Sequence, residues 1–401
     1  MNAFSNPQMI ADKALQRLEN NLVIGGLINR QYDDQFSRTG TKKGVTINIR
    51  KPAHYIGREG AEAQVEGITD PLVPLTIDIQ YGVDLGYSSA QEALNLESYD
   101  EQVIQPAVSR IAHFWDSKIF EKAYRDVANH VGTLGTDPNS IDTYIDAGVK
   151  LTNNAVPVGD LRRVVISPKM EGEVIKGEKS RFNGQRVLSE MMRTGTMGHE
   201  VGFDFYMAQG VKRHTVGAYA GVPLTNASSA QSGTSLVTDG WTGSTGLKRG
   251  DVFTIADVYE VNLETKESTG ALRQFVVTAD CNPSSGDMTI AFEPELVPNG
   301  AYQNVTNAAA NNKSITVFAT ASAVGSQGLA FHRDFCTMAM VDLYVPKGVD
   351  LSGRSSSKKR NLSIRFVRFY DGRTDQLITR LDTLGGIKVL RPEMACRVSG
   401  S

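Results

Sequence analysis

Apolar and polar residues alternate without a break between Leu75 and Leu85. The apolar positions are Leu75, Ile77, Ile79, Tyr81, Val83 and Leu85, and the positions between them are Thr76, Asp78, Gln80, Gly82 and Asp84. Successive side chains of a β-strand point to opposite faces of the sheet, so this pattern predicts one long, half-buried strand.

A second alternating run lies upstream and predicts a partner for this strand. Val45, Ile47 and Ile49 alternate with polar residues, and a charged stretch from Arg58 to Gly67 separates the two runs. Together the runs predict a long hairpin that projects from the body of the protein. Since a ribbon with one apolar face requires cover, and no catalytic cluster is visible, we expect another copy of the protein to cover it.

Helical spacing of apolar residues predicts two helices around this hairpin. A modest amphipathic helix is predicted over Pro7–Asn29, which fits equally well a packed helix and an arm that reaches a neighbouring subunit. The strongest helical pattern runs from Tyr99 to His130, with Ser98 as a candidate N-cap. Pro106 predicts a bend or the true start of this helix.

The middle of the chain has a mixed α/β pattern. A helix is predicted over Ile141–Asn153, a buried strand over Arg163–Ser167, a helix opened by Pro168, and a second strand over Phe203–Ala208.

The composition changes at about Gly221, and helical spacing disappears as far as about Ala323. Short alternating runs separated by turn residues replace it, at Val252–Ile255, Tyr259–Leu263, Arg273–Thr278, Met288–Phe292 and Ser314–Thr320. Five or six short strands at this spacing predict a small β-barrel inserted into a larger domain.

Charge and cysteine content restrict the kinds of protein that this sequence can encode. The 401 residues include 42 basic and 44 acidic ones, and this balance argues against a protein that binds nucleic acid by neutralising phosphates. Three widely spaced cysteines do not suggest a disulfide framework. The N-terminus shows no signal-peptide pattern and no window has the length of a membrane span, so we expect a soluble, cytosolic product without membrane contact.

Motifs for catalysis or metal binding are weak. None of the six histidines stands at short metal-ligand spacing from another histidine or a cysteine. We therefore expect no catalytic residues, no metal and no cofactor. The tripeptide Arg249–Asp251, Arg-Gly-Asp, could suggest receptor adhesion, but it directly precedes a predicted strand, and a tight turn is the simpler interpretation.

Several segments resemble the major capsid proteins of tailed bacteriophages, in the branch typified by the coat protein of a short-tailed Salmonella phage, P22. The residues that carry the resemblance are Gly328–Asp334, Thr337–Leu343, Ile364–Asp371, Arg380–Asp382 and Leu390–Arg397, together with Leu247–Ile255 for the extra β-barrel of that branch. The order of the predicted elements also matches, so the resemblance covers nearly the whole chain.

The resemblance implies an α+β, HK97-like capsid fold with an inserted small β-barrel. The expected domains are an N-terminal arm (1–40), an extended hairpin or E-loop (41–90), a spine helix with peripheral domain (91–140), an axial domain (141–220), the inserted barrel (221–323), an axial segment and hinge (324–360) and a return to the peripheral domain (361–401). The barrel would stabilise the monomer or contact neighbouring subunits.

The resemblance also implies the function and the partners. Identical chains would form hexamers and pentamers of an icosahedral shell around double-stranded DNA, with a scaffolding protein and a portal protein as partners, weak non-specific DNA contact, and assembly in the host cytoplasm. At the hairpin tip, Arg58, Glu59, Glu62 and Glu66 are the expected inter-subunit contacts. The alternatives are an enzyme or carbohydrate-binding protein with a β-barrel accessory module, or a nucleic-acid-binding protein.

Overall fold

The chain contains two compact units, each with its own hydrophobic core. The computed structural model describes residues 7–30, 46–57, 60–61, 65, 67, 71–88, 104–159, 161–177, 197–357 and 361–400. Unit 1 comprises Met1–Arg50, Leu72–Ile119 and Cys336–Leu390, and unit 2 comprises Lys51–Pro71, Phe120–Phe335 and Arg391–Ser401.

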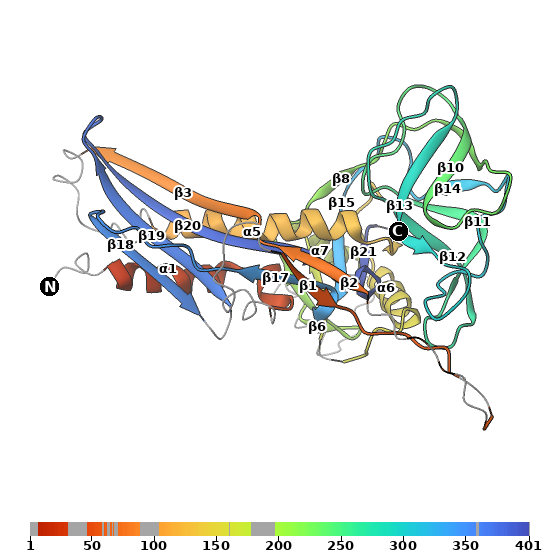
Figure 1. Ribbon diagram of the computed structural model, residues 1–401, viewed down its shortest axis with the longest axis horizontal. Helices are drawn as coiled ribbons and strands as arrows, with labels where there is room; N and C mark the ends of the chain where they lie inside the picture. The colour runs from red at the N-terminus through yellow and green to blue at the C-terminus, as the bar shows by residue number, and fades with distance from the viewer. Residues whose placement is uncertain are drawn as a thin grey trace. The chain divides into compact units, whose positions relative to one another are not determined.

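Unit 1 is built on an antiparallel sheet in which β20 is the central strand. Figure 1 shows β3, β20, β19 and β18 running side by side. One edge of β20 pairs with β3, and the other edge pairs first with β19 and then with β17. The strands are β3 (Ile79–Ser88), β17 (Cys336–Met340), β18 (Leu351–Ser357), β19 (Leu362–Asp371) and β20 (Gln376–Val389).

The long helix α5 (Gln105–Asp126) carries the aromatic residues that pack on this sheet. Trp115 is fully buried, and its indole Nε1–H donates to Thr383 Oγ1 of β20 over 2.9 Å. Phe114 stacks on Tyr81 of β3, with ring centroids 3.6 Å apart. Aromatic burial of this kind holds the helix against β3 and β20.

The predicted hairpin exists, but its second strand is interrupted. β1 (Thr46–Arg50) pairs antiparallel with β2 (Leu72–Thr76), and the chain then leaves the strand at Ile77 and Asp78 before β3 begins. The prediction of one strand across this point was wrong. β2 and β3 have different partners, β1 and β20, and the chain breaks where it changes from one to the other.

The apolar face of this segment is covered by the protein's own chain. Leu75 and Ile77 have no exposed surface and belong to a cluster with residues of β1, β17 and β20. The expectation that another copy covers this face was therefore wrong for these two residues. Burial within the chain removes the same apolar area from water without a partner.

The N-terminal segment belongs to unit 1 and packs on strands β18 and β19. It forms two helices, α1 (Pro7–Asn21) and α2 (Ile24–Leu27), instead of the single predicted helix. Ala14 and Leu18 are fully buried, and Ser355 of β18 donates to Asp12 over 2.6 Å. Of the two interpretations left open by the sequence, the packed helix is the one found for these residues.

Buried Asp116 of α5 explains the break between α1 and α2. Its two carboxylate oxygens accept the backbone N–H groups of Val23 and Gly25, each over 2.9 Å. These N–H groups stand at the start of α2, where helical donors lack partners within the helix. Burial raises the pKa of Asp116, and the two hydrogen bonds oppose that rise.

The long helix is shorter at its C-terminal end than predicted. It ends at Asp126, and His130 and Val131 form strand β4, which pairs in parallel with β21. Asn129 lies between the end of the helix and β4. Its side-chain amide donates to the carbonyl of Ala395 in β21 over 3.0 Å, and this hydrogen bond holds the chain where helix changes to strand. Pro106 is the second residue of the helix, as expected for a helix start, while Ser98 lies outside the described residues. No helix among the described segments is long and apolar enough to cross a membrane.

Unit 2 contains a mixed six-stranded sheet covered by helices α6 and α7. The strand order is β4-β21-β16-β5-β7-β6, and only the pairs β4/β21 and β5/β7 are parallel. Tyr144 and Leu151 of α6 pack with Met170 and Val174 of α7 in the core. The elements are α6 (Asp142–Asn153), β5 (Arg162–Ile166), α7 (Pro168–Gly177), β6 (His199–Glu200), β7 (Phe203–Met207), β16 (Gly328–His332), β21 (Ala395–Val398) and the short 3₁₀ helices Arg333–Phe335 and Pro392–Met394.

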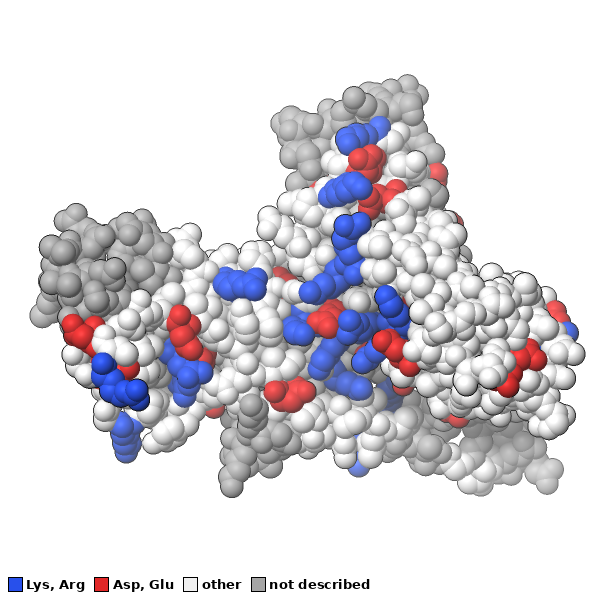
Figure 2. Space-filling model, turned by 90° about the horizontal axis from the view of Figure 1, so that it is seen from above, with Lys and Arg blue, Asp and Glu red and all other residues white. Residues whose placement is uncertain are grey.

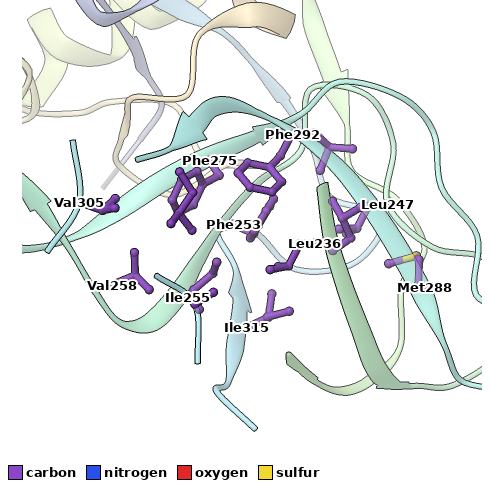
Figure 3. Close-up of a cluster of buried hydrophobic side chains, with 14 of the residues drawn as sticks. Leu236, Leu247, Phe253, Ile255, Val258, Phe275, Met288, Phe292, Val305 and Ile315 are labelled. Carbon is purple, nitrogen blue, oxygen red and sulfur yellow. The ribbon is translucent and has the colours of Figure 1, made fainter. Parts of the chain in front are cut away.

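The β-barrel of unit 2 is a six-stranded sheet that closes on itself. The strand order is β14-β11-β12-β13-β10-β9, and backbone hydrogen bonds between Thr225 and the segment Asn312–Lys313 join the two outer strands. Phe253, Phe275 and Phe292 point toward one another inside it, with ring centroids 5.1–5.8 Å apart (Figure 3). Its strands are β9 (Gly221–Thr225), β10 (Gly233–Trp241), β11 (Val252–Val261), β12 (Ser268–Val277), β13 (Met288–Leu296) and β14 (Ile315–Val317).

The barrel differs from the sequence prediction in one strand and is accompanied by a strand pair that was not predicted. The predicted strands Val252–Ile255 and Tyr259–Leu263 are one strand, β11, whose register with β12 shifts between Thr254 and Tyr259. Such an irregularity breaks the alternation in the sequence without ending the strand. Strands β8 (Arg213–Thr215) and β15 (Val324–Ser326) pair where the chain enters and leaves the barrel.

We predict that Gly82→Ala destabilises unit 1. A Cβ atom at this position of β3 would overlap the carbonyl of Leu381 and the carboxylate of Asp382, which is buried and paired with Arg365 and Arg380. We expect a loss of about 1–3 kcal/mol in the free energy of unfolding, measured in urea.

The matched control is Gly172→Ala in α7. No atom lies within 4 Å of the added Cβ atom there, and alanine favours helix, so stability should stay the same or rise by up to about 1 kcal/mol. Equal behaviour of the two variants would contradict the role assigned to Gly82.

Candidate functional site: the barrel junction and the hairpin segment

The turn Lys248–Asp251 joins the barrel to the rest of unit 2. The N–H of Asp251 donates to the carbonyl of Lys248 over 3.0 Å, and Gly250 has a φ of +98°, which glycine adopts without strain. The tight turn predicted for the Arg-Gly-Asp tripeptide is therefore confirmed.

The carboxylate of Asp251 binds three groups, two in the segment before the barrel and one in its own turn. Its Oδ1 lies 2.7 Å from Nε2 of His214 in β8, and both side chains are buried. Its Oδ2 accepts the backbone N–H groups of Gly217 and Lys248, over 3.0 and 2.8 Å. A buried carboxylate with all these partners fixes the segment that precedes the barrel against the turn that opens β11.

The other two residues of the tripeptide bind elements distant in the sequence. Gly250 accepts a hydrogen bond from Nη1 of Arg397 in β21 over 2.8 Å. Arg249 forms an ion pair of 2.9 Å with Asp126 at the end of α5. Arg397 is fully buried, and burial lowers its pKa to about 10.

A second buried contact joins β12 to β4. The backbone N–H of His130 donates to Oε1 of Gln274, and Nε2 of Gln274 donates back to the carbonyl of His130, over 2.8 and 2.9 Å. The ring of His130 lies 2.9 Å from Ser399 Oγ. Burial, with Arg397 nearby, lowers the pKa of His130 well below its usual range, so the ring is neutral at pH 7.

A third contact connects the hairpin of β11 and β12 to helix α6. Arg273 and Glu260 form a buried ion pair, and Arg273 also donates to Asn154 just beyond the helix over 3.3 Å. Asn262 donates to the carbonyl of Asn153 over 3.0 Å. The barrel is thus attached to the α/β sheet of unit 2 at three buried polar sites.

The predicted hairpin-tip contacts Arg58, Glu59, Glu62 and Glu66 lie outside the described residues. Neighbouring described residues are unusually apolar for an exposed segment. Tyr55 is 55% exposed, Ile56 is 61% exposed and Val65 is 97% exposed. Preceding them, the ring of His54 packs edge-on against Tyr302 of the barrel, with centroids 5.4 Å apart.

The described side chains at the barrel junction make structural contacts with one another. Among the described residues, no group of three or more His, Cys, Asp or Glu side chains could hold a metal ion. Burial raises the pKa of the Cys396 thiol to about 12, which leaves it protonated and unreactive. On the face drawn in Figure 2, basic side chains gather in the middle, with acidic side chains between them.

A family model described as "P22 coat protein - gene protein 5" matches residues 1–400. The chain belongs to the P22 coat protein family. It is thus a shell-forming major capsid protein of the tailed phages, whose copies associate in a shell and whose location is the virion. The HK97-like α+β fold expected from the sequence, with its barrel-like sheet, is confirmed.

Solved structures similar to this coat protein come from viruses and a virus-like particle. One from Mycobacterium phage Che8 has 14% identity and a TM-score of 0.47, and covers 95% of this chain and 92% of that chain. The capsid of Cyanophage P-SCSP1u has 12% identity and a TM-score of 0.42, with 90% and 84% covered. A virus-like particle from Pyrococcus furiosus has 8% identity and a TM-score of 0.42, with 97% and 98% covered. No curated protein sequence matches the chain.

Asp251→Asn should destabilise unit 2 by roughly 2–4 kcal/mol. The amide nitrogen would face either the ring of His214 or the two backbone N–H groups, so a donor would replace one acceptor of the buried carboxylate and the hydrogen bonds around it would be disrupted. Urea unfolding followed by tryptophan fluorescence, to which Trp241 of the barrel contributes, measures the change.

Arg249→Ala is the control within the same turn. The Arg249 side chain is 46% exposed, and its ion pair with Asp126 contributes about 0–1 kcal/mol in such a setting. If both variants unfold at the same urea concentration as the wild type, Asp251 does not hold the junction.

Proposed function

We propose that this coat protein assembles into hexamers and pentamers that close an icosahedral shell around double-stranded DNA. The observation that carries the proposal is the family match over residues 1–400. An identical chain that occupies six-fold and five-fold positions needs a rigid body with adjustable contacts. The three buried attachments of the barrel supply rigidity, and the exposed hairpin segment supplies a contact surface.

The role we propose is structural rather than catalytic, with a scaffolding protein and a portal protein as partners during assembly in the host cytoplasm. These partners rest on the resemblance seen in the sequence. A net charge of -2 supports contact with packaged DNA that is weak and non-specific, since strong binding depends on phosphate neutralisation by basic residues.

We further propose the domain roles that the resemblance implies. The hairpin over residues 41–90 is the extended loop that reaches a neighbouring subunit, α5 is the spine helix, and residues 221–323 are the inserted barrel. The apolar residues Tyr55 and Ile56, beside the charged tip, support the assignment of the hairpin as a contact element.

Electron microscopy with light scattering, on protein expressed with and without a co-expressed scaffolding protein, tests this function. Closed shells, or rings of six and five, are the expected result. A stable monomer under every condition would overturn the proposal.

Neutralising the acidic hairpin tip should weaken assembly. In the variant Glu59→Gln, Glu62→Gln, Glu66→Gln, each lost pair costs about 0–1 kcal/mol, so the concentration needed for assembly should rise several-fold at low salt. The difference from the wild type should shrink at high salt because salt screens exposed pairs.

The control removes three exposed acids from the barrel, as Glu264→Gln, Glu267→Gln, Glu293→Gln, and makes the same change in net charge. Equal weakening in the two variants would indicate an effect of total charge and contradict specific pairing at the hairpin tip.

A further inference from the structure

A small cavity lies at the barrel junction, and Asp251 is one of the residues that line it. Its volume of about 10 Å³ gives room for a single water molecule. The apolar part of its wall includes Val216 and Val252, which are both buried. The polar part includes Arg397 of β21 and Gln327, which lies between β15 and β16. All of these residues belong to unit 2.

The guanidinium group of Arg397 has two donors left over in this cavity. Its Nη1 donates to the carbonyl of Gly250 over 2.8 Å. Its Nε and Nη2 have no hydrogen-bond partner among the described residues, although Arg397 is only 1% exposed. The N–H groups of Nε and Nη2 point from one edge of the planar guanidinium, so a single acceptor placed there can receive both. Leaving donors of a buried charge without an acceptor is costly.

Gln327 has the opposite requirement, because its Oε1 is a buried acceptor that receives no hydrogen bond from the described residues. The rest of the residue is held in place. Its backbone N–H donates to the carbonyl of Lys212 over 2.9 Å, and its Nε2 donates to the carbonyl of Ser326 over 3.4 Å. The cavity is therefore lined by one residue that lacks acceptors and one that lacks a donor.

We propose that the cavity binds one structural water molecule, which accepts from Nε and Nη2 of Arg397 and donates to Oε1 of Gln327. Water both accepts and donates, so it matches the two residues at once. Buried waters in proteins typically make about three hydrogen bonds to polar groups that otherwise lack partners. The three atoms of Arg397 and Gln327 are a set of this size.

A small anion fits the same cavity less well than water. Arg397 would attract an anion, but the carboxylate of Asp251 and the Oε1 atom of Gln327 would repel it. The charge of Arg397 also has a counter-charge nearby, since Asp251 opposes the fall in the pKa of Arg397 that burial causes. A neutral ligand therefore leaves the charges of this buried region balanced.

The water would attach the chain where it leaves the barrel. Asp251 already fixes the entry, through His214 of β8 and the backbone of Gly217. Gln327 directly follows β15, the strand of the exit, and Arg397 lies in β21, which pairs with β16. A water bridge between Gln327 and Arg397 would hold the exit to the α/β sheet, so that entry and exit are both fixed by buried polar groups.

A crystal structure of the purified coat protein, grown with bromide in place of chloride and at a resolution that shows ordered water, identifies the occupant. The expected result is one water at about 2.7–3.2 Å from Nε and Nη2 of Arg397 and from Oε1 of Gln327. An empty cavity would overturn the proposal. An anomalous bromide signal at this position would overturn it in favour of an anion.

Urea unfolding of three variants tests the same water without a crystal. Val216→Ile adds a methylene group beside the cavity, and Gln327→Met removes the acceptor while nearly keeping the side-chain volume. Each change would deprive the water of space or of a partner. Each should therefore raise the unfolding equilibrium constant roughly tenfold.

The double variant Val216→Ile, Gln327→Met should unfold no more readily than the less stable single variant, because the same water can be lost only once. Fully additive effects would contradict the proposal, since overpacking by isoleucine alone would cost as much in either background. A rise in stability in Val216→Ile would also overturn it, because an added methylene group gains contacts only in a dry cavity.

Discussion

The carboxylate of Asp251 is the interaction on which the arrangement of unit 2 depends. It lies where the strand before the barrel, the connection into the barrel and the turn that opens β11 meet. A buried anion is stable only when hydrogen-bond donors surround it. Each segment therefore requires the others in place, and the barrel cannot move relative to the β8 segment without leaving a charge unpaired.

Local sequence patterns predict the helices and strands of this protein well where the bounds of an element depend on its own residues. Helix α6 and strands β5 and β7 were predicted to within about one residue at each end, because their apolar spacing matches the core they enter. The break at Ile77–Asp78 and the end of α5 were not predicted. Both depend on strands that are distant in the sequence, β20 for the first and β21 for the second. Periodicity carries no information about such partners.

The same limit applies to the candidate site. The Arg-Gly-Asp turn could be predicted because turn chemistry is local, but its partners Asp126, His214 and Arg397 come from three other regions of the chain. Tyr55 and Ile56 were visible in the sequence as two bulky apolar residues in a polar stretch. Their exposure and the contact of His54 with Tyr302 could be recognised only from the structure.

The closure of the barrel between β9 and β14 matters when many copies of the protein are packed side by side. An open sheet edge offers unpaired N–H and C=O groups to any strand nearby, whatever its sequence, and invites uncontrolled aggregation. In the barrel those groups are used by Thr225, Asn312 and Lys313. When many copies lie close together in a shell, this seam offers no free backbone groups to a strand of a neighbouring copy, so errors of backbone pairing at the seam are avoided.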